Sequence, residues 1–127
     1  MLELLFVGTG GFLGCCFRFC LTRLIPSTTG FPAATLLSNV IAGFLIGFFT
    51  GLEKSAGWMT PRVKLFLTTG MLGGLSTFST FSLETLRLLS DANYLYAFGN
   101  IILNLTLSFS GVALGVVAAR LITGKSM

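Results

Sequence analysis

Four long apolar stretches, separated by short polar turns, set the pattern of this chain. A helix that crosses a bilayer needs about 20 consecutive apolar residues, and each stretch reaches that length. The expected helices cover residues 2–24, 32–52, 62–89 and 94–122. We therefore predict an all-α membrane protein with four transmembrane helices, which form a single transmembrane domain over residues 1–127.

Composition and charge support this class of protein. Charged residues make up only 9% of the chain, whereas a soluble domain usually contains about 25%. The net charge is +4, but the basic residues lie mostly at segment ends, as membrane-interface anchors do. Because the chain has no basic cluster, we expect no nucleic-acid partner.

Four spans place both termini on the same side of the membrane. The side that carries the termini is predicted to face the cell interior, because it has more basic residues, although the excess is small enough to be compatible with insertion in both orientations. The counts compare Lys54, Arg62, Lys64, Arg120 and Lys125 on that side with Arg23 and Arg87 on the other.

Small and polar residues recur every four positions in several segments. In the first segment Gly10, Gly14 and Arg18 share one helix face, and small residues at this spacing let helices approach closely. Arg18 is either a snorkelling side chain or a buried structural residue. The same spacing recurs in the second segment, at Asn39, Gly43, Gly47 and Gly51. Asn39 either joins helices or donates a hydrogen bond to a ligand.

The fourth segment carries a polar stripe of Asn100, Asn104 and Ser108, again four residues apart. A stripe of this kind faces a partner helix or a water-filled path. Enzymatic chemistry is not expected, because the chain has no histidine and Glu84 is its only deep carboxylate.

The middle of the third segment is unusual for a membrane helix. A glycine pair precedes a run of hydroxyl residues, and both disfavour a continuous helix, so we predict a break near Gly73 to Ser76. A break at membrane depth is tolerated only where it is buried in protein or lines a cavity. It also frees backbone carbonyl groups, which suit a hard cation such as Na⁺.

The residues after this break suit a small anion. Phe78 and Phe81 are three apart and can stack, and the edges of aromatic rings are positive. Ser79 and Thr80 place hydroxyl donors between the rings. Conduction requires binding that is weak enough for release, and these groups carry no fixed positive charge.

This run, with Glu84, resembles the signature of the Fluc (CrcB) family of fluoride channels. The resemblance covers essentially the whole chain, since further matches are Gly10-Gly11, Gly14, Arg18, Thr35-Leu36, Asn39 and Gly43. It implies an antiparallel, dual-topology homodimer with two pores at the subunit interface. It also implies passive export of fluoride through the plasma (inner) membrane, which protects the cell from fluoride toxicity.

The resemblance also assigns roles to residues. Its fluoride-pore residues are Asn39, Phe78, Ser79, Thr80, Phe81 and Glu84, and Arg18 is structural. Asn100, Asn104 and Ser108 are further pore candidates, although better-known members have a tyrosine where Asn100 aligns. A structural Na⁺ at the centre of the dimer would be held by backbone carbonyls of Gly73 and Ser76. The expected partners are fluoride, membrane lipid and a second copy of the chain.

Two other functions are compatible with the residues alone. A small proton-coupled exporter would need a titratable carboxylate on the substrate path, and Glu84 is the candidate. An accessory subunit of a larger membrane complex would explain the glycine spacings but not the cluster of hydroxyl and phenylalanine residues at one break.

Overall fold

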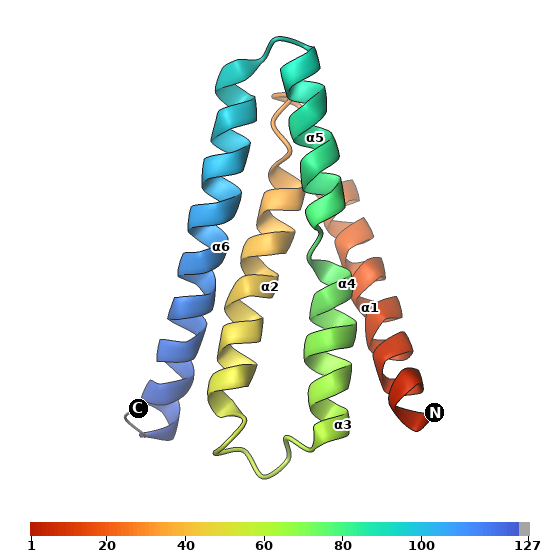
Figure 1. Ribbon diagram of the computed structural model, residues 1–127, viewed down its shortest axis with the longest axis vertical. Helices are drawn as coiled ribbons and strands as arrows, with labels where there is room; N and C mark the ends of the chain where they lie inside the picture. Colours follow the sequence, from red (N-terminus) through yellow and green to blue (C-terminus); the bar gives the residue numbers. More distant parts are fainter. Residues whose placement is uncertain (125–127) are drawn as a thin grey trace.

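The computed structural model describes residues 1–124, and over this range every regular element is a helix (Figure 1). The helices are α1 (Leu2–Leu24), α2 (Ala33–Leu52), α3 (Pro61–Lys64), the π-helix η1 (Leu65–Leu72), α4 (Gly73–Leu75), α5 (Phe78–Ser90) and α6 (Tyr94–Thr123). These bounds agree with the predicted spans to within about two residues. The beginning of α1 and the end of α6 lie at the same end of the bundle, as four spans require. Lys125, which was counted in the charge comparison, lies outside the described residues.

The exterior of the bundle is suited to lipid. Helices α1, α2 and α6 are each long and apolar enough to cross a bilayer. The third span is divided into α3, η1, α4 and α5, which follow one another along the bundle. Large apolar side chains point outward, for example Leu95 at 81% and Leu121 at 79% exposure. This exposure is stable in hydrocarbon and not in water, so the chain is a membrane protein with one interrupted helix.

Glycines allow the helices to pack backbone against backbone. A Cβ added at Gly14 in α1 would overlap the carbonyl of Met71 in η1, the element that packs against α1. Helices α2 and α6 share the most extensive contact in the bundle. There, a Cβ at Gly47 would overlap the carbonyl of Val112. The predicted packing seams are therefore confirmed, and they let the helices pack closely.

The interruption of the third span lies at the end of the predicted region, and of the two predicted causes only the hydroxyl residues take part in it. Ser76 and Thr77 are the extended residues, with ψ of 151° and 122°. Gly73 and Gly74 are helical, so the glycine pair does not itself break the helix. A Cβ at Gly74 would lie 2.7 Å from the Gly11 carbonyl oxygen, which shows that this glycine serves close packing on α1.

Replacing Gly14 with alanine is expected to lower the thermal stability of the purified protein, by about 1–3 kcal/mol of unfolding free energy, because the added methyl overlaps backbone. Gly8→Ala is the matched control in the same helix, since a Cβ at Gly8 meets nothing within 4 Å. Thermal unfolding in detergent measures both. Equal melting temperatures for the two variants would contradict the packing seam.

Candidate functional site

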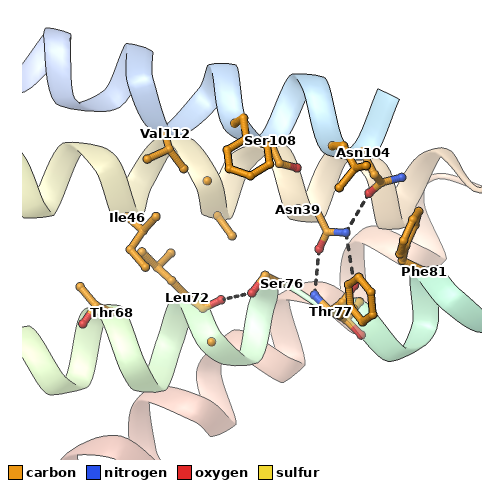
Figure 2. A pocket seen from close by; sticks show the side chains of 16 residues that line it. Asn39, Ile46, Thr68, Leu72, Ser76, Thr77, Phe81, Asn104, Ser108 and Val112 are labelled. Carbon is orange, nitrogen blue, oxygen red and sulfur yellow. Dashed lines mark hydrogen bonds between the residues drawn. The ribbon is translucent and has the colours of Figure 1, made fainter. Parts of the chain in front are cut away.

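A cavity of about 370 Å³ lies beside the interruption, between α2, α6 and the third span (Figure 2). Sixteen residues line it, and none of them carries a charged side chain. Its polar lining comes from amide and hydroxyl side chains: Asn39, Thr68, Ser76, Thr77, Asn104 and Ser108. The cavity therefore offers hydrogen bonds without fixed charge.

Asn39 connects three parts of the bundle at this cavity. Its Oδ1 accepts a hydrogen bond from the backbone N–H of Thr77 at 2.8 Å. Its Nδ2 donates to the carbonyl of Thr77 at 3.3 Å and to Oδ1 of Asn104 at 2.9 Å. These bonds are drawn in Figure 2. Asn39 thus joins α2 to the interruption and to α6, and both hydrogens of its amide are engaged.

The interruption leaves several backbone carbonyls without their usual helical donors, and those of Gly73 and Ser76 are two of them. In a continuous α-helix the amides of Thr77 and Thr80 would bond the carbonyls of Gly73 and Ser76. Instead, Thr77 N–H donates to Asn39, and Thr80 N–H donates to the Thr77 hydroxyl at 3.2 Å. Gly73 and Ser76 both line the cavity. Carbonyl oxygens freed in this way fit the preference of a hard cation such as Na⁺.

Two aromatic rings border the cavity. The ring centroids of Phe78 and Phe81 are 5.5 Å apart, with 52° between the ring planes. Phe81 is buried, at 8% exposure, while Phe78 is 76% exposed. Because the two ring planes are tilted, the rings do not both present their faces to the cavity. The edge of an aromatic ring is its electropositive part and can attract an anion.

Three of the predicted pore residues lie beside the cavity and not in its lining. The hydroxyls of Ser79 and Thr80 lie 3.4 Å and 3.1 Å from the Thr77 hydroxyl. Glu84 borders a second cavity of about 280 Å³, where its Oε1 accepts a hydrogen bond from Thr35 at 2.8 Å. Its Oε2 is buried with no hydrogen-bond partner among the described residues.

The polar stripe of α6 divides into two parts. Asn104 and Ser108 line the cavity, whereas Asn100 is completely buried behind it. No described residue accepts a hydrogen bond from the Ser108 hydroxyl, although the hydroxyls of Thr68 and Ser76 both bond carbonyls of their own helix. Ser108 is therefore the hydroxyl donor in the lining that is available to a ligand.

Arg18, predicted to be structural, stays close to its own helix. Its guanidinium lies 3.8 Å from Sγ of Cys15, and the residue is partly exposed. This position supports neither of the two interpretations of Arg18 over the other.

Three threonines with no predicted role take part in hydrogen bonds around the site: Thr35, Thr77 and Thr85. Thr77 had a readable signal, because a threonine directly before an apolar helix start is a typical N-cap, and its hydroxyl accepts from Thr80 N–H. Thr85 had none, since its partner Asn100 is distant in sequence. Thr35 matters only because the fold brings it to Glu84.

Fold and site together define a small polytopic membrane protein whose broken helix lines an uncharged, mostly apolar cavity that contains a few amide and hydroxyl groups. Residues 5–116 match the model of the family described as CrcB-like protein, Camphor Resistance (CrcB). The chain therefore belongs to the CrcB family.

Named relatives agree with this assignment. The chain is 43% identical to the fluoride-specific ion channel FluC of Ruminiclostridium cellulolyticum, over 96% of this chain and 95% of the relative. It is 41% identical to the FluC protein of Clostridium perfringens, over 96% and 97% of the two chains. For FluC of Pyrococcus abyssi the identity is 43%, over 87% and 90%. These relatives are named as ion channels and not as enzymes.

Proposed function

We propose that this protein is a fluoride-selective channel that conducts F⁻ passively. The observation that carries the proposal is an uncharged cavity at a helix break, lined by a phenylalanine pair and by the free hydroxyl of Ser108. A small, strongly hydrated anion must exchange its water for donors of this kind. Without a lysine or arginine in the lining, the ion is not trapped. The names of the relatives support fluoride as the ion.

The proposed path follows the donors along the bundle. Ser108 and the edges of Phe78 and Phe81 would replace part of the hydration shell. Asn39 would take part by exchanging its longer bond, the one of 3.3 Å to the Thr77 carbonyl, for a bond to the ion. Ser79 and Thr80 would continue the path on the far side of Phe81, with Glu84 at its end.

We further propose that two copies of the chain assemble as an antiparallel, dual-topology homodimer in the inner membrane. The cavity is bordered by α2, α6 and the third span only, so a second copy could complete two pores at the interface. Phe78, which lines the cavity at 76% exposure, would then be covered. A native mass measurement that gives only monomers would refute this assembly.

The freed carbonyls of Gly73 and Ser76 would hold a structural Na⁺ at the centre of that dimer. The ion would supply positive potential near the path without a titratable group. A structural Na⁺ at this place agrees with the carbonyl oxygens that the interruption leaves without hydrogen-bond donors, because such oxygens are suitable ligands for the ion.

A proton-coupled exporter is less well supported by the relatives, which are named as ion channels. That function requires a titratable carboxylate on the substrate path. Glu84, the deep carboxylate, borders the second cavity and bonds Thr35. Fluoride release that depended on a proton gradient, and lost this dependence in Glu84→Gln, would favour the exporter.

Liposomes that contain the purified protein are expected to release fluoride rapidly and to release no measurable chloride. Valinomycin clamps the membrane potential, a fluoride electrode records fluoride release, and chloride release is measured separately as the control. Replacing all Na⁺ by N-methylglucamine is expected to slow fluoride release, because the carbonyl site would be empty. Silence from a folded dimeric sample would contradict the channel. Fluoride release that is equally rapid with and without Na⁺ would contradict the proposed Na⁺ site but not the channel function.

A further inference from the structure

A line of hydrogen bonds runs from the cavity into the interior of the bundle. Asn39 Nδ2 donates to Asn104 Oδ1 at 2.9 Å. Asn104 Nδ2 donates to Asn100 Oδ1 at 2.8 Å, and Asn100 Nδ2 donates to Thr85 Oγ1 at 3.0 Å. The Thr85 hydroxyl then donates to the carbonyl of Phe81 at 2.8 Å. We call these bonds, from Asn39 to Phe81, the amide relay.

Backbone groups fix the direction of the amide relay at both ends. The N–H of Thr77 can only donate, so Asn39 must turn Oδ1 toward it and Nδ2 toward Asn104. At the other end the Phe81 carbonyl can only accept, so it takes the hydrogen of the Thr85 hydroxyl. The oxygen of Thr85 is then left to accept from Asn100.

The middle of the amide relay is fixed in the same sense. Asn104 Nδ2 also donates to the backbone carbonyl of Asn100, at 2.9 Å. Turning any one amide over would set two N–H groups or two oxygens against each other. Because Asn100, Asn104 and Thr85 are buried, such a mismatch among them leaves polar atoms unpaired in a medium that cannot compensate for them.

The inner members of the amide relay cannot contact a conducted ion. Asn100 is 0% exposed and Thr85 is 7% exposed, and neither lines the cavity. Any influence on the site must therefore pass through Asn104 and Asn39. Asn39 holds Thr77 in the extended conformation, and this hydrogen bond keeps the Thr77 amide away from Gly73.

We propose that Asn100 and Thr85 are positioning residues: through the amide relay they orient Asn39 and hold the interruption at Ser76–Thr77 open. This inference deepens the proposed function and rests on it only where fluoride release is the readout. Thr85 is the member best suited to a test, because its oxygen accepts from Asn100 while its hydroxyl donates to the Phe81 carbonyl.

The test is a graded series at Thr85, measured as backbone amide exchange in detergent and as fluoride release from liposomes. Thr85→Val keeps the shape but has no acceptor, Thr85→Ser keeps the hydroxyl without the methyl, and Thr85→Cys, compared with Thr85→Ser, replaces that hydroxyl by a weak acceptor. Thr106→Val is the matched control, since the Thr106 hydroxyl bonds only the carbonyl of Ile102 in its own helix. Even if the valine variant fails to assemble, the cysteine variant reports on the acceptor.

We expect Thr85→Val to speed exchange at the Thr77 amide and to slow fluoride release, each by roughly tenfold, because a buried donor is left unpaired. The cysteine variant should be intermediate, and the serine variant and Thr106→Val should match the unmodified protein. Faster exchange confined to Thr77 supports positioning, whereas a uniform rise along α5 and α6 would show a merely stabilising role and overturn the proposal.

The two proposals fail in distinguishable ways. If the unmodified protein releases no fluoride while Thr77 exchange follows the series, the channel function fails and the positioning role stands. If the unmodified protein conducts and both readouts stay flat across the series, the positioning role is overturned and the channel function stands.

Discussion

Phe81→Ile is expected to reduce fluoride release from liposomes by roughly a hundredfold, which corresponds to about 3 kcal/mol of lost ion stabilisation. Phe81 lines the cavity beside Phe78, with their ring centroids 5.5 Å apart. Isoleucine fills similar space but has no electropositive ring edge, so the ion loses a contact that replaces water. The fluoride electrode assay measures this loss directly.

The Phe81 variant must be compared with one that removes a ring outside the site. Phe12→Ile serves this purpose, because Phe12 lies on α1 at 69% exposure and borders a different surface. Size-exclusion chromatography confirms that both variants assemble. Fluoride release from an assembled Phe81→Ile protein at the rate of Phe12→Ile would remove Phe81 from the proposed path.

Asn39→Leu is expected to have the largest effect on stability, about 3 kcal/mol, together with loss of fluoride release. Leucine is close to asparagine in size but leaves Thr77 N–H and Asn104 Oδ1 without their partners. Unpaired buried groups of this kind cost about 1–3 kcal/mol each. Thermal unfolding in detergent and the release assay measure the two consequences.

A second substitution at Asn39 separates its two functions. Asn39→Asp keeps an oxygen that accepts from Thr77 N–H but loses both donors of the amide. We expect this variant still to bind the Thr77 amide but to conduct poorly, because its second oxygen faces Asn104 Oδ1 and the Thr77 carbonyl and cannot donate to them. A Asn39→Leu protein as stable as Thr106→Val would show that Asn39 does not hold the interruption.

Part of the site could be predicted because it depends on local sequence. The glycines at intervals of four face other helices regardless of which helix they meet, since the spacing follows from the helical repeat. The hydroxyl run after Gly74 indicated a break in the right region. The pair Phe78 and Phe81 could be recognised because residues three apart on a helix are neighbours.

Other parts depend on contacts between distant residues and could not be predicted. The interruption falls at Ser76–Thr77 because Asn39, on another helix, takes the Thr77 amide. The stripe of α6 looked uniform, yet only Asn104 and Ser108 reach the cavity, while Asn100 turns toward Thr85. Which acceptor a polar side chain finds is decided by the helix that packs beside it.

The sequence by itself determined the membrane class, the four spans, the shared side of the termini and the interrupted third helix, because hydropathy and residue spacing act along the chain. It also placed the chemistry of the site near Phe78. Only the tertiary structure decided the direction of the amide relay, the two residues at which the third span is interrupted, and the separation of Glu84 from the main cavity. Each of these depends on hydrogen bonds between helices, whose geometry exists only once the bundle has packed.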